Sequence, residues 1–197
     1  MSDKIKAQID KINKAFDDLP DLMQQAGKKA LSIHGREFIR WFTKKRLTGR
    51  PGLKRRTGSL ARSFKTNVLE LSGAMVLMVW TTSKYARIHE FGGIVTPKKS
   101  KYLAIPTNAA LTKAGATRYA SPRNVPGLSF MQRKGGLPFM GKVEGGRVRA
   151  YFLLRKRVKI PPRLELGKSW TARGRRIPYL LGKVAENVLS TRFEKVR

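Results

Sequence analysis

The longest apolar run in the chain, AMVLMVW at residues 74–80, is the feature that most limits its fold. Seven apolar residues suit one strand and fall well short of the roughly 20 that a bilayer-crossing helix needs. The turn residues Ser72 and Gly73 precede the run, and another strand-like segment covers residues 64–71. Two such runs joined by a two-residue turn predict a β-hairpin over residues 64–82.

Helical periodicity flanks this hairpin. Ile5, Ile9, Ile12 and Phe16 recur at helical spacing and predict a helix over residues 3–17. After a break at 19–21, a longer helix is expected from Pro20 to about Thr43, and a final one over 177–195. Further strands are expected at 101–106, 128–132, 138–142 and 148–158, and a short helix within 83–91. This order lacks βαβ alternation and predicts an α+β fold, with a mostly antiparallel sheet packed against a long N-terminal helix and a C-terminal helix.

The pattern also predicts a domain organisation. We expect residues 1–20 to form an N-terminal amphipathic helix or arm and residues 21–197 to form a single α+β domain. Basic loops are expected within it at 46–57 and 108–126. The three tryptophans, Trp41, Trp80 and Trp170, stand at apolar-face positions and are expected in the core.

Charge indicates the kind of partner. The chain has 43 Lys and Arg against 12 Asp and Glu, a net charge of +31. All five aspartates lie in the first 21 residues, and from Leu22 onward 39 basic residues face seven glutamates. Such a charge repels itself unless it meets a polyanion, an acidic protein or an assembly that holds it. The chain has no cysteine and two histidines, so disulfides, thiolate chemistry, a metal site and a cofactor are not expected.

One stretch, YARIHEFGG at residues 85–93, suggests a catalytic site because His89 stands beside Glu90. Neighbouring side chains in a helix or strand point in different directions, which disfavours a working acid–base pair. His34 and Glu37 lack the second histidine of a zinc-protease helix, and no G-x-S-x-G or phosphate-binding glycine loop occurs. We therefore expect no catalytic residues and no enzyme activity.

Basic clusters are the stronger candidates for binding. Arg46, Arg50, Lys54, Arg55 and Arg56 form the first cluster. Two more lie at residues 155–159 and 173–176. Each could neutralise phosphates, and a solvated surface is an equal alternative for any single cluster.

Several motifs occur in a fixed order along the chain. R-T-G-x-L-x-x-S at 56–63 is followed by the apolar strand, Y-A-x-I-H-E-F-G-G at 85–93, K-Y-L-A-I-P at 101–106, F-M-Q-R-K-G-G at 130–136 and V-x-I-P-P-R at 158–163. Together they resemble the virion-morphogenesis, or tail-completion, family of tailed bacteriophages. The motif residues are Gly58, Leu60, Ser63, Tyr85, Ala86, His89, Phe91, Gly92, Gly93, Pro161 and Arg163. After the last strand, members of the family usually have a proline, a small residue and then Arg-Pro-Phe. This chain has Leu164-Glu165 in place of Pro-Phe. The apolar contact expected of that segment is therefore not carried over.

The resemblance implies a structural role in a virion. Such proteins complete the head-proximal end of the tail so that it can join the DNA-filled head. The resemblance implies a homo-oligomeric ring, expected to be a hexamer. This ring would contact tail terminator, tail tube or head–tail connector proteins. DNA or the tape-measure protein would lie in its lumen, and the first basic cluster would face nucleic acid or this lumen. Assembly is expected in the host cytoplasm and the final location in the tail or neck, without a membrane partner.

Composition leaves a second function class open. A free-standing basic nucleic-acid-binding protein would also account for the charge of +31, although not for the ordered motifs. A nuclease or peptidase is a distant third, because the seven later glutamates are scattered.

Overall fold

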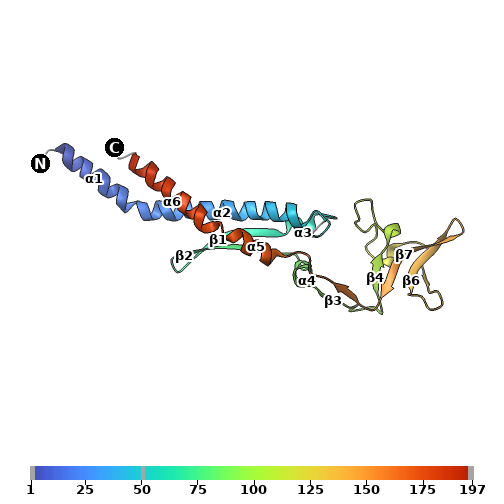
Figure 1. Cartoon of the computed structure of the whole chain (residues 1–197). Helices are drawn as coiled ribbons and strands as arrows, with labels where there is room; N and C mark the ends of the chain where they lie inside the picture. Colours follow the sequence, from blue (N-terminus) through green and yellow to red (C-terminus); the bar gives the residue numbers. More distant parts are fainter. Residues whose placement is uncertain (1–2, 50–51, 195–197) are drawn as a thin grey trace. The chain divides into compact units, whose positions relative to one another are not determined.

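The computed structural model describes residues 3–49 and 52–194 and confirms the α+β fold (Figure 1). The helices are α1 (Asp3–Asp17), α2 (Leu19–Arg46), α3 (Ser59–Arg62), α4 (Ala86–Phe91), α5 (Leu166–Gly174) and α6 (Ile177–Glu194). The strands are β1 (Phe64–Leu71), β2 (Ala74–Thr81), β3 (Gly93–Val95), β4 (Leu103–Pro106), β5 (Ser129–Met131), β6 (Phe139–Glu144), β7 (Arg147–Arg155) and β8 (Val158–Ile160). Every pairing between these strands is antiparallel.

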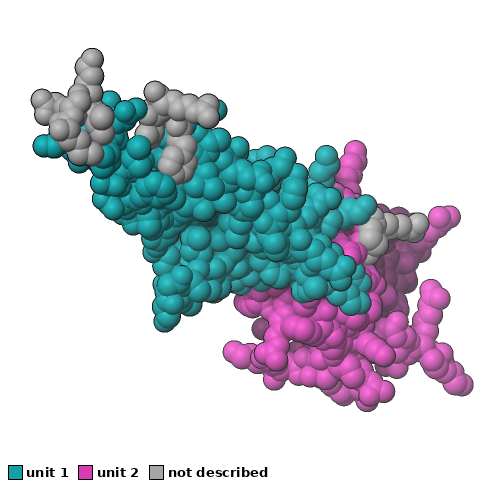
Figure 2. Space-filling view, turned by 60° about the vertical axis from the view of Figure 1, so that its left-hand side comes forward, with its two compact units in different colours: residues 1–45, 63–82, 165–197 teal, residues 46–62, 83–164 magenta. Residues whose placement is uncertain are grey.

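The chain divides into two compact units (Figure 2). Unit 1 takes residues 1–45, 63–82 and 165–197, and unit 2 takes residues 46–62 and 83–164. Each unit draws on separate stretches of sequence, so neither is a continuous sequence domain. Whether residues 21–197 behave as one domain stays a prediction. The expected break after the N-terminal helix falls at Asp18, between α1 and α2.

Unit 1 is built on α2, along which the β1–β2 hairpin runs (Figure 1). The hairpin pairs in register from Phe64 opposite Thr81 to the tight turn at Ser72 and Gly73. Aromatic rings fill the space between the elements, because Phe42 is fully buried and its ring centroid lies 5.2 Å from that of Phe64. Helix α5 joins this core through Trp170, whose ring meets Phe38 edge-on at 4.9 Å.

A close approach of helix and strand depends on Gly35, which is buried on α2. A Cβ at this position would collide with Thr66 Oγ1 of β1 and stand 2.9 Å from Leu77 Cδ1 of β2. Glycine therefore lets the hairpin pack against the helix backbone, although glycine costs a helix about 1 kcal/mol relative to alanine.

Unit 2 contains two small sheets. Strands β3 and β8 pair over three residues, from Gly93 opposite Ile160 to Val95 opposite Val158. The chain between them, residues 96–157, includes a four-stranded sheet in the order β4-β7-β6-β5. The predicted loop at 108–126 contains two short 3₁₀ turns and supplies Ala110 and Val125 to a buried cluster with Tyr151 and Phe152 of β7.

Three details differ from the sequence predictions. The strand expected at 148–158 is two strands, β7 and β8, which belong to different sheets and are separated at Lys156 and Arg157. Helix α5 was not predicted, because few of its residues are large and apolar. Trp80 is 39% exposed on β2 rather than in the core. Within the described residues, the helices are too short or too polar to span a bilayer.

Candidate functional site

Two motifs that are far apart in sequence meet in unit 2. The YARIHEFGG motif forms α4 and β3, and the V-x-I-P-P-R motif forms β8 and the segment after it. Beyond the β3–β8 pairing, the His89 carbonyl accepts hydrogen bonds from the backbone N–H groups of Arg163 at 2.8 Å and Leu164 at 2.9 Å. The end of α4 is therefore fastened to the chain leaving β8, and we call these paired segments the motif junction.

Glycine at position 92 is required by this junction. Gly92 has a φ of +72°, in the left-handed region that other residues seldom adopt. A Cβ there would stand 2.9 Å from Pro162 Cδ and 3.0 Å from the Ile160 carbonyl oxygen. The Gly-Gly pair of the motif thus serves a turn packed against β8, which is an architectural role.

The His89 side chain is half-buried, and its Nδ1 has no hydrogen-bond partner among the described residues. Burial lowers the pKa of His89 below its ordinary value, and the charge of Arg163 lowers it further. The imidazole is therefore neutral at pH 7. In the part of the chain that the structure describes, no carboxylate orients the ring through Nδ1, as an acid–base dyad using that atom would require. The expectation that the chain is not an enzyme stays a prediction.

The remaining residues of the motif junction divide into buried and exposed sets. Ala86 is buried at 4% exposure, whereas Tyr85 is 63% exposed and Phe91 is 76% exposed. Pro161 and Arg163 are also exposed. Leu164 is only 1% exposed. It therefore supplies a buried apolar group in the segment after β8, where the family resemblance did not lead us to expect an apolar contact. Sequence reasoning missed it because Leu164 stands outside the pattern of the motif.

The R-T-G-x-L-x-x-S motif forms α3 and the entry to β1. The Gly58 carbonyl accepts a 3.1 Å hydrogen bond from Arg62 N–H, and Leu60 is half-buried. Ser63 closes the open end of the hairpin, because its hydroxyl lies 2.7 Å from that of Thr81. This motif also has an architectural role.

The first basic cluster lies partly on a closed loop. Leu53 N–H donates a 2.7 Å hydrogen bond to the Arg46 carbonyl, and Thr48 pairs with Lys54 as an isolated bridge. Lys54, Arg55 and Arg56 are exposed, and Arg46 is half-buried. Arg50 lies outside the described residues. The loop is thus hydrogen-bonded across its base and presents three adjacent cations.

The two predicted basic loops come together in unit 2. The Arg56 side chain passes beside Gly115, where its Nε would be 3.8 Å from a Cβ at that position. Loop 108–126 is itself held by backbone pairing between Leu111 and Thr117. The structure therefore joins two segments that the sequence analysis treated separately.

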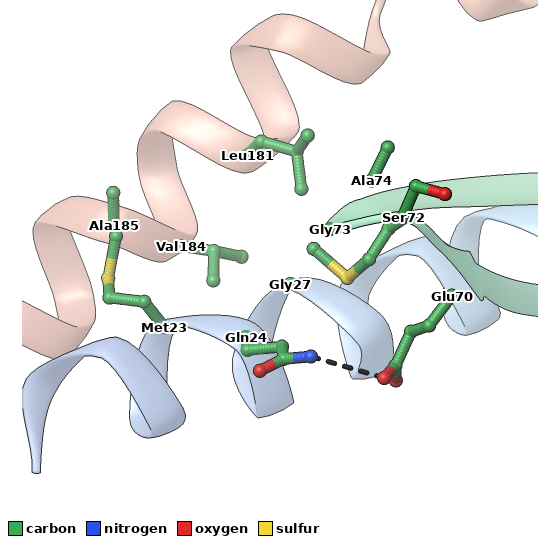
Figure 3. A pocket seen from close by; sticks show the side chains of 11 residues that line it. Met23, Gln24, Gly27, Glu70, Ser72, Gly73, Ala74, Leu181, Val184 and Ala185 are labelled. Carbon is green, nitrogen blue, oxygen red and sulfur yellow. Dashed lines mark hydrogen bonds between the residues drawn. The ribbon is translucent and has the colours of Figure 1, made fainter.

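Unit 1 contains a hollow of about 530 Å³ beside the tip of the hairpin (Figure 3). Apolar side chains of α2, β2 and α6 line it, and the polar residues Gln24, Glu70 and Ser72 complete the lining. There the Glu70 carboxylate accepts hydrogen bonds from Lys28 Nζ at 2.7 Å and Gln24 Nε2 at 3.1 Å. The hydrogen bond from Lys28 lowers the pKa of Glu70. This carboxylate is committed to a structural ion pair, so the hollow has the character of a packing surface.

Comparisons with models of known protein families, with curated proteins and with solved structures found no match to this chain. Within the described residues, no group of three or more His, Asp or Glu side chains could hold a metal ion. The family resemblance therefore depends on the order of the motifs along the sequence.

Proposed function

We propose that this chain is a structural virion protein of a tailed bacteriophage, which completes the head-proximal end of the tail as one subunit of a ring. The motif junction is the observation that supports the proposal most. YARIHEFGG and V-x-I-P-P-R resemble the family as separate motifs, and here they form one hydrogen-bonded unit around the His89 carbonyl. The two motifs are thus neighbours in the fold as well as members of one ordered series along the sequence.

The surface near the junction suits a subunit of an assembly. Tyr85, Phe91 and Ile94 are 63%, 76% and 61% exposed, which is unusual for three large apolar side chains within ten residues. They would pack against a neighbouring subunit or against tail terminator, tail tube or connector proteins. The exposed cations Lys54, Arg55 and Arg56 would face DNA or the tape-measure protein in a lumen.

Deletion of the gene from the genome that carries it tests the proposal. We expect filled heads and finished tail tubes that fail to join, counted by negative-stain electron microscopy. Complementation with wild type should restore joined particles, and Phe91→Asp should not. Leu137→Asp, which changes a 55% exposed apolar residue away from the junction, is the matched control and should restore them. Normal numbers of joined, infectious particles without the gene would sink the proposal.

The net charge of +31 favours a second candidate, a free-standing nucleic-acid-binding protein. Such a protein with six or more phosphate contacts should lose about 10³-fold or more in affinity for duplex DNA between 50 and 200 mM salt. Alanine at Lys54, Arg55 and Arg56 should lower the slope of log affinity against log salt by about 3. Alanine at the exposed Lys98, Lys99 and Lys101 is the charge-matched control. This candidate would be excluded if DNA binding is weak and the salt dependence of the affinity is unchanged by alanine at Lys54, Arg55 and Arg56.

A further inference from the structure

The β1–β2 hairpin is covered on one face only. Alternation along the strands places Thr66, Val68 and Leu77 on the face that packs against α2. Leu71, Val76, Met78 and Trp80 lie on the opposite face and are 55%, 39%, 41% and 39% exposed. We call these four residues the open face. Apolar residues on both sides of a strand are typical of a sheet that is covered twice, so the open face lacks its second layer.

A second apolar feature of unit 1 is also uncovered. Helix α1 presents Ile9 and Ile12 at helical spacing, and they are 41% and 38% exposed. Near its C-terminal end the helix is held by Ala15, which is buried, and by the ion pair between Asp18 and Arg192 of α6, at 2.6 Å. An isolated helix of 15 residues is marginal in water, so α1 gains stability from any apolar surface that covers it.

Charge identifies what can cover the open face. Two copies of a chain with a net charge of +31 repel each other over most of their surfaces. Residues 1–21 are the exception, because they hold all five aspartates against four lysines. The rest of the chain carries 39 basic residues and seven glutamates. Helix α1 itself, with four lysines against three aspartates, is nearly balanced, so it is the segment that a second copy can place against this basic body with the least added like charge.

We infer that α1 of one copy docks, through Ile9 and Ile12, on the open face of the hairpin of a second copy. Each subunit gives one helix and receives another. Because the two surfaces differ, the contact can repeat around a closed ring, whose smallest form is a reciprocal dimer, or along an open chain. The inference deepens the proposed ring and rests on that proposed function. It names two surfaces of the chain that the motifs do not include.

The natural absence of cysteine makes the contact directly testable. Purified Ile12→Cys and Met78→Cys proteins are mixed at equal concentration, oxidised mildly and run on a non-reducing gel. We expect a disulfide-linked mixed dimer at least tenfold above the level given by Lys14→Cys with Met78→Cys. Lys14 lies two residues after Ile12 and hence on the opposite side of the same helix, which makes it the matched control. A chain carrying both Ile12→Cys and Met78→Cys should give a ladder of multimers.

Other occupants of the open face give different products. A disulfide within single chains of the doubly substituted protein would show that α1 folds back on its own hairpin, and would overturn the inference. Met78→Cys dimers in excess of mixed dimers would indicate two open faces packed together, with the same consequence. Equal crosslinking of the Ile12 and Lys14 variants would also overturn it.

The contact and the proposed function can fail separately. Rings seen by electron microscopy without the Ile12–Met78 disulfide would sink the contact and leave the tail role intact. If crosslinking is specific but deletion of the gene leaves the particles normal, the contact would stand and the proposed tail function would fail. Ile9→Asp, checked for helix content by circular dichroism, should abolish the oligomer, and the same change added to the Ile12→Cys protein should abolish the mixed disulfide.

Discussion

The hairpin of unit 1 and the four-stranded sheet of unit 2 solve the problem of covering a sheet in different ways. In unit 2, loop 108–126 folds onto β7 and buries Tyr151 and Phe152 at 7% and 3% exposure. In unit 1, α2 covers one face of the hairpin and leaves Met78 and Trp80 about 40% exposed on the other. The four-stranded sheet of unit 2 is completed by its own connecting loop. The hairpin of unit 1 keeps one face open, and the docking inferred above would supply its second layer.

The largest expected change in stability comes from comparing alanine substitutions at a buried position of the unit 2 sheet and at an exposed position of the hairpin. Phe152→Ala should destabilise unit 2 by about 3–5 kcal/mol, because it leaves a cavity among Ala110, Val125 and Tyr151. Met78→Ala in dilute monomer should change stability by about 0.5 kcal/mol or less. Urea unfolding followed by far-UV circular dichroism measures both, and similar losses would contradict the contrast.

The same variant tests whether the units unfold together. Trp41, Trp80 and Trp170 all belong to unit 1, so tryptophan fluorescence reports on that unit. If residues 21–197 are one cooperative domain, Phe152→Ala should lower the fluorescence midpoint as much as the circular dichroism midpoint. An unchanged fluorescence midpoint would show two independently unfolding units.

Gly92→Ala should have the next largest effect and should act in unit 2. We expect a loss of about 2–4 kcal/mol, because left-handed strain of about 1–2 kcal/mol adds to crowding against Pro162. Gly145→Ala is the matched control, since Gly145 also has a positive φ, +57°, but has no atom near the added Cβ. The difference between the two midpoints reports the crowding at the motif junction together with the added strain of the extended ψ, −176°, at Gly92. Equal losses would mean that β8 does not pack on Gly92.

Gly35→Ala tests the covered face of the hairpin and should cost about 1–3 kcal/mol. The reason is that the Thr66 hydroxyl donates a 3.0 Å hydrogen bond to the Met78 carbonyl and would have to give it up to make room for a new methyl group. Gly27→Ala on the same helix should be neutral or stabilising by up to about 1 kcal/mol, since the atom it meets is the mobile Met75 Cε at 2.8 Å. Thermal unfolding of the pair measures this, and a stabilised Gly35→Ala protein would refute the close approach.

The smallest effect concerns pH and the two histidines, one in each unit. Burial lowers the pKa of both His34 and His89; Glu37 partly opposes this at His34, whereas Arg173 and Arg176 add to it. The unfolded chain therefore binds more protons, so stability is full above the ordinary histidine pKa of about 6.5 and is lost as pH falls below it. Unfolding midpoints between pH 7.5 and 5 measure the loss. His34→Gln and His89→Gln should each flatten the profile, and a profile that rises on acidification would contradict the expectation.

Periodicity in the sequence predicted the parts of the fold that local pattern decides. Helices α1, α2 and α6 and both strands of the hairpin follow from regular apolar spacing and a Ser-Gly turn. The division of 148–158 into β7 and β8 depends on which partner strand each half meets, and side-chain pattern carries no such information. The exposure of Trp80 follows from a covering layer that the single chain lacks, which apolar character alone does not reveal.

The candidate site was predictable in its members and not in its geometry. The motifs named Gly92, His89 and Pro161 in advance, but the contact that joins them runs through the His89 carbonyl and two backbone N–H groups. Backbone groups are the same in every residue, so no residue type marks that contact. The approach of Arg56 to Gly115 is a similar case. Glycine has no side chain whose chemistry could indicate a contact with arginine, so the sequence does not predict this pair.

The short β3–β8 ladder gives residues 96–157 the status of an exchangeable module. Three residue pairs, from Gly93–Ile160 to Val95–Val158, bring the two ends of this long segment together. Loop-closure entropy rises only slowly with length, by about 0.6 kcal/mol for each doubling, so a base of this kind tolerates inserts of very different sizes. The four-stranded sheet could thus be shortened, enlarged or replaced in evolution or by design while α4 keeps its attachment to the chain after β8. Such an arrangement lets a protein change the surface that this module presents without rebuilding the rest of the fold.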